Sequence, residues 1–339
     1  MSFVRIWVIG GSRRGDEAQA CALAEELGLP FETRKLRFNW VSRLRGRFMG
    51  ASPVSVEREL RETTLVPPWP DLIILSGKRT VPVARWVQAQ SGGRTRLVLV
   101  GHPRVSPELF DLVYTTRQYL TPSGPSVRLQ PVAMSRYREP PKVTGQERSW
   151  LDSLPRPHWL LMLGGETRHW KMRSRSIANV AAGLAHRADK AGGSLIVVRS
   201  GRTSDEVLDE TETRLEGEQC EWRVVRHDFP RFAVLLEDAD MLFPTADSVS
   251  MISESVITGK PVGIVPVEMN WFGRIALGSE RSMHGKPARD LRRFWNFLFE
   301  NELAGTLEEP RSSDIPNPVV AAAREVRALL EKSFGKLPA

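Results

Sequence analysis

The residues best suited to chemistry gather in the second half of the sequence, around the segment from Thr245 to Pro261. It reads Thr-Ala-Asp-Ser-Val-Ser-Met-Ile-Ser-Glu-Ser-Val-Ile-Thr-Gly-Lys-Pro. Ser248 and Ser250 stand at an expected helix start, where free N–H groups and hydroxyls favour phosphate oxygens. Glu254 follows about two turns later and can accept hydrogen bonds from ribose hydroxyls. A well-capped helix alone would not need so many hydroxyls and an acid.

Two further loops supply groups that a phosphate needs. Gly164-Gly-Glu-Thr167 follows one expected strand, and Ser200-Gly-Arg-Thr203 follows the next. Taken alone, each loop is equally well a plain tight turn. Together they offer a backbone cradle, hydroxyl donors and a cation, which suits a pyrophosphate. A nucleotide-sugar contains such a pyrophosphate and would be the sugar donor in a transfer reaction. The residues expected to bind it are Gly164, Gly165, Thr167, Arg202, Thr203, Ser248, Ser250 and Glu254.

A glycine-rich turn also opens the first half, where Gly10-Gly-Ser-Arg-Arg-Gly-Asp-Glu-Ala-Gln19 follows an apolar run. Glycines let backbone N–H groups approach an anion, and the next helix adds its positive end. The spacing is not G-x-G-x-x-G, and Gly77-Lys78 is not part of a P-loop, so neither nucleotide fingerprint is present. Asp16 has two interpretations: a base that deprotonates an acceptor hydroxyl, and an ordinary helix N-cap.

Apolar runs that alternate with helical patterns predict the elements that position these residues. Expected strands cover residues 3–9, 72–75, 97–100, 110–114, 159–163, 195–198, 222–225, 241–243 and 262–265. The alternation indicates βαβ units and mostly parallel sheets, which bind ligands at the carboxyl ends of their strands. We therefore expect an α/β fold of two Rossmann-like domains that face each other across a cleft, the layout of GT-B glycosyltransferases.

The domain boundary is expected near two proline clusters within residues 139–157, which have the composition of a linker. The prediction is an N-terminal acceptor-binding domain over residues 1–150 and a C-terminal nucleotide-sugar-binding domain over 151–315. A C-terminal helix within 316–339 can cross back to the first domain. The aromatic side chains in the later part of the second domain are interpreted as packing residues: Trp271, Phe272, Phe294, Trp295, Phe297 and Phe299.

Composition limits the class of protein. The 339 residues are 41% hydrophobic and 26% charged, which is typical of a folded chain with room for two domains. The two cysteines, Cys21 and Cys220, form no disulfide or zinc pattern and favour a reducing compartment. No apolar run approaches the roughly 20 residues of a membrane-spanning helix, and the N-terminus does not resemble a signal peptide.

Metal chemistry is not expected from the sequence. The six histidines show no ligand spacing such as H-E-x-x-H. Asp238-Ala-Asp240 matches the metal-binding D-x-D of another glycosyltransferase fold, but its place just before a strand favours a helix-end turn. We therefore expect no metal and no cofactor other than a nucleotide-sugar co-substrate.

Charge is concentrated in the first half. Residues 1–150 contain 23 lysines and arginines and 13 acidic residues, whereas the remainder contain 25 and 27. The segment 34–49 interleaves these cations with Phe38, Trp40 and Met49, a pattern that can lie on an anionic membrane. A solvated basic loop is an equally good interpretation. Nucleic-acid binding is not expected, since no recognised motif accompanies the charge.

The chain resembles the mitochondrial-fission ELM family of plants and bacteria, whose bacterial members are proposed to be glycosyltransferases. The shared motifs cover most of residues 1–265 in the same order. They are Gly15-Asp-Glu-Ala-Gln19, Ser76-Gly-Lys-Arg-Thr80 with Pro82-Val-Ala-Arg85, Pro103-Arg104 with Phe110-Asp-Leu-Val113, Gly201-Arg-Thr203, and the segment 245–254 with Thr258-Gly-Lys-Pro261. The chain departs from the family at Glu17, where asparagine is expected, at Gly101-His102, where an acid is more usual, and at Arg117-Gln118, where a His-Asp pair is often found.

The resemblance implies a GT-B fold in which the C-terminal domain binds the nucleotide-sugar and the N-terminal domain the acceptor. The expected acceptor or phosphate loop comprises Gly11, Arg14, Gly15, Gln19, Lys78, Arg79, Thr80 and Arg104. We expect an inverting, metal-independent glycosyltransferase with Asp16 as the base. Its acceptor would be a lipid-linked or cell-envelope saccharide such as lipopolysaccharide, reached from the cytoplasm or the inner face of the cytoplasmic membrane. The alternatives are a non-catalytic membrane-associated adaptor and a nucleic-acid-binding protein.

Overall fold

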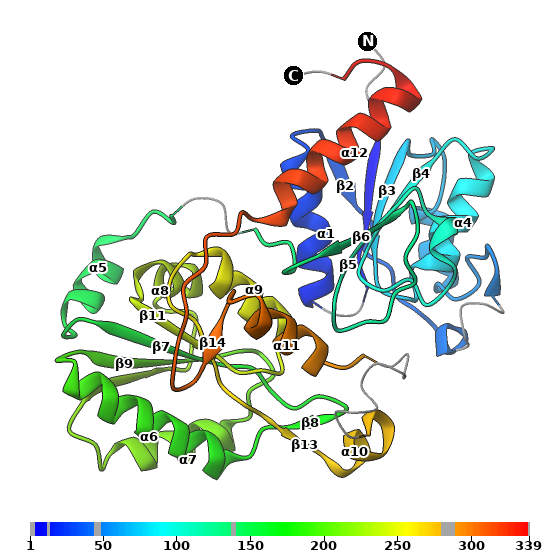
Figure 1. The fold of residues 1–339 in the computed structure, drawn as a ribbon. Coiled ribbons are helices and arrows are strands. Elements are labelled where there is room, and N and C mark those ends of the chain that lie inside the picture. Colours follow the sequence, from blue (N-terminus) through cyan, green and yellow to red (C-terminus); the bar gives the residue numbers. More distant parts are fainter. Residues whose placement is uncertain (1–3, 12–13, 44–48, 137–139, 279–288, 338–339) are drawn as a thin grey trace. The chain divides into compact units, whose positions relative to one another are not determined.

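The computed structural model describes residues 4–11, 14–43, 49–136, 140–278 and 289–337. The chain divides into two compact units. Unit 1 comprises Met1–Arg136 and Asn317–Ala339, and unit 2 comprises Tyr137–Pro316. Each unit is an α/β structure built on a parallel sheet (Figure 1).

Unit 1 contains a six-stranded parallel sheet in the order β2-β1-β3-β4-β5-β6. The strands are β1 (Ile6–Ile9), β2 (Phe31–Thr33), β3 (Leu72–Ser76), β4 (Arg96–Val100), β5 (Leu112–Thr116) and β6 (Val127–Gln130). The central strands are continuous apolar runs because both faces of the sheet are covered. The strand order reverses between β1 and β3, which places a topological switch point at their carboxyl ends.

Helices cover both faces of this sheet. They are α1 (Arg14–Glu26), α3 (Arg58–Thr64), α4 (Val81–Gln90) and α12 (Pro318–Phe334), with short 3-10 turns at Trp40–Arg43 and Pro107–Leu109. The sheet has one apolar core on each face, and alternate side chains of β1 belong to different cores. Ile6 and Val8 pack with α1 and α12, whereas Trp7 and Ile9 pack with α4.

The C-terminal helix α12 is fixed to the rest of unit 1 by a partly buried polar network as well as by apolar packing. The Tyr114 hydroxyl donates to Glu325 Oε2 at 2.8 Å, and Arg128 Nε donates to Glu325 Oε1 at 2.7 Å. Arg327 donates to the carbonyl of Leu27 at 2.6 Å. Burial, assisted by Glu325, raises the pKa of Tyr114, which keeps its hydroxyl protonated as a donor.

Unit 2 contains a four-stranded parallel sheet in the order β10-β9-β7-β11. The strands are β7 (His158–Leu163), β9 (Ser194–Arg199), β10 (Glu221–Val225) and β11 (Met241–Pro244). Single bridges pair Val262 with Leu242 and Val265 with Thr245, so the predicted last strand extends the sheet beyond β11 without forming a continuous ladder. The switch point of this sheet lies between β7 and β11.

The helices of unit 2 lie in two layers. They are α5 (Gly145–Asp152), α6 (Ser174–Lys190), α7 (Asp205–Leu215), α8 (Phe232–Asp238), α9 (Val249–Ile257), α10 (Trp271–Leu277) and α11 (Arg292–Glu300). Figure 1 shows α6 and α7 on one side of the sheet and α8, α9 and α11 on the other. Two short ribbons complete the unit: β12 (Gly263–Ile264) pairs with β14 (Gly305–Thr306), and β8 (Trp170–Lys171) pairs with β13 (Glu268–Met269).

The proline-flanked segment 139–157 contains an ordered helix, α5, within unit 2. Thr144 and Glu147 form a capping box at its start. The Glu147 carboxylate also accepts from Arg231 Nη2 at 2.7 Å, and this hydrogen bond is the main reason its pKa is lowered. Asp238 and Asp240 are engaged at the start of β7, where Asp240 accepts from the backbone N–H of His158 at 2.7 Å and Asp238 lies 2.6 Å from His158 Nδ1.

Candidate functional site at the switch point of unit 2

The loop after β7 is joined to the loop after β11 by two hydrogen bonds from backbone N–H groups to side chains. The N–H of Gly164 donates to Thr245 Oγ1 at 2.8 Å, and the N–H of Gly165 donates to Asp247 Oδ2 at 3.0 Å. All four residues are buried. The two loops therefore form one rigid surface at the switch point, where open α/β sheets bind ligands.

The loop after β9 joins the same surface. The hydroxyls of Ser200 and Thr203 donate to the carbonyl of Gly164 at 2.9 and 2.6 Å. Arg202 Nη1 donates to the carbonyl of Gly165 at 3.0 Å. The structure thus brings together the three segments that the sequence selected, although Thr203 uses its hydroxyl within the protein.

Asp247 is the residue that sequence analysis missed, and it lies at the centre of this arrangement. Its side chain is 1% exposed and accepts from Arg202 Nη2 at 2.8 Å and from the Thr245 hydroxyl at 2.7 Å, in addition to Gly165. A carboxylate at the end of a strand, flanked by Thr245 and Ser248, was the available signal. Asp247 holds the guanidinium of Arg202 in place and balances part of its charge.

The two glycines are required by close packing. A Cβ atom on Gly164 would lie 2.3 Å from both carboxylate oxygens of Asp247. A Cβ atom on Gly165 would lie 2.2 Å from the carbonyl oxygen of Arg202. Any side chain here would push the three loops apart, so the absence of side chains at these positions preserves the surface.

The start of α9 presents free backbone donors at this surface. Ser248 is the N-cap and accepts from the N–H of Met251 at 3.5 Å. Within the described residues, the backbone N–H groups of Val249 and Ser250 have no hydrogen-bond partner. Two neighbouring hydroxyls serve the helix itself, because Ser253 donates to the carbonyl of Val249 and Ser255 to that of Met251. The free donors are those that the helix dipole makes attractive to an anion.

Glu254 lies on α9 in a desolvated environment. Burial raises the pKa of its carboxyl to about 7. No described residue donates a hydrogen bond to it or pairs with its charge. A carboxylate in this position would be stabilised by hydroxyl donors from a ligand.

Thr167 uses its backbone N–H within its own loop. Its N–H donates to the carbonyl of Trp170 at 3.0 Å, which closes a turn leading into β8. The region is braced by Trp295 of α11, whose indole N–H donates to the carbonyl of Ala246 at 2.8 Å. The rings of Trp170 and Trp295 meet edge to face at 4.8 Å. This packing fixes the residue before Asp247.

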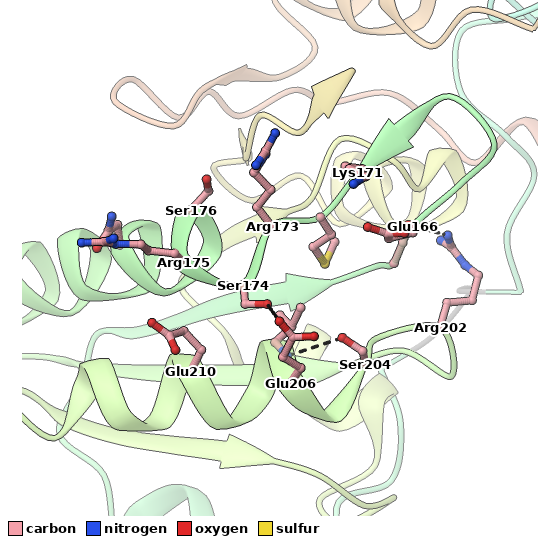
Figure 2. Close-up of a pocket in the computed structure, with 14 residues that line it drawn as sticks. Glu166, Lys171, Arg173, Ser174, Arg175, Ser176, Arg202, Ser204, Glu206 and Glu210 are labelled. Carbon is pink, nitrogen blue, oxygen red and sulfur yellow. Dashed lines mark hydrogen bonds between the residues drawn. The ribbon is translucent and has the colours of Figure 1, made fainter. Parts of the chain in front are cut away.

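A polar hollow of 980 Å³ opens beside Gly165 and Arg202 (Figure 2). It lies over the first turns of α6 and α7, and Lys171, Arg173 and Glu206 are among the charged side chains that line it. The Ser174 hydroxyl donates to Glu206 Oε1 at 3.0 Å and ties the two helix starts together. The mixture of cations, acids and hydroxyls suits a polar ligand with several hydrogen-bonding groups.

In unit 1, the glycine turn meets the loop after β3. The N–H of Gly11 donates to Ser76 Oγ at 3.3 Å, and a Cβ on Gly11 would lie 2.9 Å from the Ser76 carbonyl. Lys78 is exposed on the same loop and Arg79 is half-buried. Thr80 is fully buried and donates its hydroxyl to the carbonyls of Ser76 and Gly77, so it stabilises the loop.

The other predicted residues of unit 1 are placed less fully. Gly15 and Gln19 lie on α1, where Gln19 Nε2 donates to the Gly15 carbonyl at 3.4 Å. Arg14 and Asp16 belong to the same helix, but their side chains lie outside the described part of the structure. Arg104 follows β4 and is exposed, with a backbone φ of 60° that is uncommon for a residue with a side chain.

Two of the three family departures, Gly101-His102 and Arg117-Gln118, follow β4 and β5 of unit 1. The rings of His102 and Tyr119 stack with centroids 4.9 Å apart, and His102 Nδ1 lies 3.0 Å from the Thr121 hydroxyl. Burial, with a smaller effect of Arg104, lowers the pKa of His102 to about 4. Gln118 is 6% exposed, and no described residue forms a hydrogen bond with its Oε1. Sequence analysis treated these residues only as departures.

No described set of three or more His, Cys, Asp and Glu side chains could hold a metal ion. Across the described helices, none has the length and apolar character needed to cross a bilayer. These two findings concern the described residues alone.

Two Rossmann-like units, each with a glycine turn after its first strand, define a GT-B fold. Three solved structures share it. Staphylococcus aureus MnaA with UDP is 11% identical, with 99% of each chain covered and a TM-score of 0.55. Neisseria meningitidis UDP-GlcNAc 2-epimerase bound to UDP-GlcNAc is 11% identical, with 97% of this chain and 100% of the other covered and a TM-score of 0.53. Methanocaldococcus jannaschii UDP-GlcNAc 2-epimerase is 12% identical, with 96% of this chain and 99% of the other covered and a TM-score of 0.51. At these identities the likeness concerns the fold alone.

Sequence comparison identifies the family. The profile described as mitochondrial fission ELM1 matches residues 14–326, and the chain therefore belongs to this family. A curated relative, the uncharacterised protein RP120 of Rickettsia prowazekii, is 30% identical over 110 residues. That match spans 32% of this chain and 31% of the relative.

Proposed function

We propose that the chain is a glycosyltransferase that binds a nucleotide-sugar donor at the switch point of unit 2. The observation that carries the proposal is the convergence of Gly165, Arg202 and the start of α9 on one surface, joined through Asp247. Structures of the same fold include complexes with UDP and with UDP-GlcNAc, which supports a sugar nucleotide as the ligand.

The donor diphosphate would lie at the start of α9. The free N–H groups of Val249 and Ser250 and the positive end of the helix dipole favour its oxygens. Arg202 supplies the cation, and its side chain is 46% exposed, so it can contact a ligand while Asp247 holds it. Glu254 would accept from the ribose hydroxyls, which would supply the donors that its carboxyl lacks. The polar hollow beside Arg202 provides room for the sugar.

The proposed reaction is an inverting transfer without a metal. The acceptor oxygen forms a bond to the anomeric carbon as the bond to the donor phosphate breaks, and the nucleoside diphosphate leaves with the electron pair. Arg202 and the α9 dipole stabilise its negative charge. Asp16 takes the proton of the acceptor hydroxyl. Positive groups in unit 1, including Lys78, Arg79 and Arg104, favour an acceptor that carries phosphate.

A lipid-linked or cell-envelope saccharide fits this acceptor chemistry. The segment 34–49 would contact an anionic membrane, where such an acceptor is found. Its Trp40 side chain is 73% exposed, and Lys35 and Arg37 precede it in sequence. Residues 44–48 of the segment lie outside the described residues. In this proposal the protein acts at the inner face of the cytoplasmic membrane.

A second candidate function is epimerisation of a UDP-sugar, because the Neisseria meningitidis and Methanocaldococcus jannaschii structures with the same fold are UDP-GlcNAc 2-epimerases. A thermal-shift panel of UDP, GDP and their sugars tests the shared requirement for donor binding. We expect a UDP or GDP species to raise the melting temperature, and the rise to be lost in Arg202→Ala. Release of nucleoside diphosphate with an acceptor then distinguishes transfer from the appearance of an epimer. A non-catalytic adaptor predicts no stabilisation by any member of the panel.

A further inference from the structure

The ribbon formed by β8 and β13 carries the short helix α10 at its end (Figure 1). We call residues 168–173 and 268–278 the arm. Two large apolar side chains of α10 are solvent-exposed: Trp271 at 71% and Ile275 at 68%. They are four residues apart and therefore lie on the same face of the helix. This corrects the expectation from sequence that Trp271 is a packing residue.

The exposure of this face does not come from a loosely held helix. The N–H of Asn270 donates to the carbonyl of His169 at 3.0 Å, and Asn270 Nδ2 donates to that of Arg168 at 3.1 Å. Asn270 Oδ1 accepts from the N–H of Gly273 at 2.7 Å and caps the helix. On the opposite face Leu277 is buried, and a Cβ on Gly273 would lie 2.4 Å from the His169 carbonyl. The arm thus holds Trp271 and Ile275 outward in a fixed geometry.

The arm is rich in basic side chains. The arm contains four exposed basic side chains, Arg168, Lys171, Arg173 and Arg274, and one acid, Glu268. Glu268 is paired with Arg173. Burial is the main cause that lowers the pKa of His169, which favours the neutral form of its ring. Residues 151–339 as a whole contain slightly more acids than bases, which makes the arm a local positive site.

We propose that the arm docks on the surface of an anionic phospholipid membrane, with Trp271 and Ile275 inserted among the lipid chains near the headgroups and Arg168 and Arg274 at the phosphates. Tryptophan and arginine are favoured at this interface, one for its amphipathic ring and the other for its hydrogen bonds to phosphate. The two apolar side chains offer roughly 300 Å², well below the about 800 Å² per partner of a stable protein interface. The patch is therefore of a size that suits lipid insertion.

This membrane contact depends neither on donor binding nor on the segment 34–49, so its test is separate. The full chain is floated with vesicles of phosphatidylcholine alone and with vesicles containing about one-third phosphatidylglycerol. We expect binding to the anionic vesicles that weakens with salt. Trp271→Ser with Ile275→Ser should lower the partition coefficient about tenfold. The melting temperature should not change, because both side chains are exposed.

A matched control replaces two other exposed apolar residues, Leu129 and Val320, with serine, and it should bind as the unmodified chain does. The proposal is overturned if the Trp271→Ser/Ile275→Ser chain floats as before, if phosphatidylcholine vesicles bind equally well, or if only Trp40→Ser abolishes binding. A change in oligomeric state with unchanged flotation would assign the surface to a second copy and also overturn it. If the Trp271→Ser/Ile275→Ser chain floats as before but is no longer stabilised by the nucleotide-sugar, the exposed face of α10 serves the transfer reaction. That result would also overturn the proposal.

Discussion

Arg202 Nη2 donates to Asp247 Oδ2 at 2.8 Å, and this ion pair joins the loop after β9 to the loop after β11. The carboxylate is surrounded by donors, because Gly165 and Thr245 also point hydrogens toward it. An ion pair with one buried partner fixes geometry more than it adds stability. Its position beside the start of α9 gives Arg202 a defined place before any ligand arrives.

Asp247→Asn should destabilise the protein and weaken donor binding. The amide nitrogen of asparagine would face an N–H or O–H group from which the carboxylate accepted a hydrogen bond. Two donors would then oppose each other, at a cost of about 1–3 kcal/mol. Arg202 would also lose the charge that positions it. Chemical denaturation and the nucleotide thermal-shift assay measure the two effects. Asp228→Asn, at an exposed acid of the same unit, is the matched control and should change neither.

A double-mutant cycle separates positioning from simple loss of charge. Arg202→Ala and Asp247→Asn should each lower the affinity for the nucleoside diphosphate, and the double variant should bind about as weakly as Arg202→Ala alone. Additive losses measured by calorimetry would mean that Asp247 does not act through Arg202.

Gly165→Ala should lower stability by about 1–3 kcal/mol because its methyl group would meet the Arg202 carbonyl oxygen. Gly183, in the middle of α6, is the control because a Cβ there meets nothing within 4 Å. Gly183→Ala should raise stability by about 0.5–1 kcal/mol, as alanine favours helix. Equal effects of the two substitutions in urea unfolding would contradict the packing described for the switch point.

Donor binding should depend on pH through Glu254, whose pKa burial raises to about 7. Ribose hydroxyls bind the ionised carboxylate best, so affinity should increase between pH 6 and pH 8. Below pH 7 binding should release a proton, which calorimetry in buffers of different ionisation enthalpy detects. In Glu254→Gln the pH dependence over this range should disappear.

The raised pKa of Glu254 also predicts how the free energy of unfolding of the protein without ligand depends on pH. A carboxyl whose folded-state pKa is raised binds its proton more tightly when folded, so its contribution is present below about pH 4 and is lost as pH rises toward 7. Glu254→Gln should therefore be more stable than the unmodified chain by about 1–3 kcal/mol at pH 8. The two chains should converge in acid. A constant difference in urea unfolding across pH would rule out this titration.

Glu325→Ala should weaken the attachment of α12 to unit 1. It removes the 2.8 Å acceptor of the Tyr114 hydroxyl, which is left with the carbonyl of Ala322 at 3.2 Å, and it removes an acceptor of Arg128, at a cost of about 1 kcal/mol. Hydrogen exchange should show faster opening of α12 than of the strands of unit 2. Glu331→Ala, elsewhere on the same helix and exposed, should leave the exchange of α12 unchanged.

Much of the fold follows from sequence because its parallel strands are buried on both faces and therefore read as apolar runs separated by helices. Ser248, Arg202 and the paired glycines were selected because each follows such a run, and parallel strands end at a common edge. The family motifs support the same order along the chain. The GT-B fold and the family are thus confirmed by comparisons that use the whole chain.

The details that sequence did not reveal depend on contacts between distant residues. Asp247 stood within the selected segment, but its function as an acceptor for three loops requires the positions of Gly165, Thr245 and Arg202. Trp271 was interpreted as a packing residue because sequence composition does not show which side of a short helix faces solvent. Thr80 was assigned to an anion loop, yet its hydroxyl is used by the carbonyls at the end of β3.

Unit 1 consists of two segments of the sequence, one before and one after unit 2. The second segment contributes α12, which packs against α1 and β1. During synthesis on the ribosome, the strands of unit 1 emerge first, but the helix that covers one face of their sheet emerges last. Unit 2 is complete before that helix is made, so it should finish folding first while the uncovered sheet waits. A chain truncated after residue 316 should therefore resist protease in unit 2 and remain sensitive in unit 1.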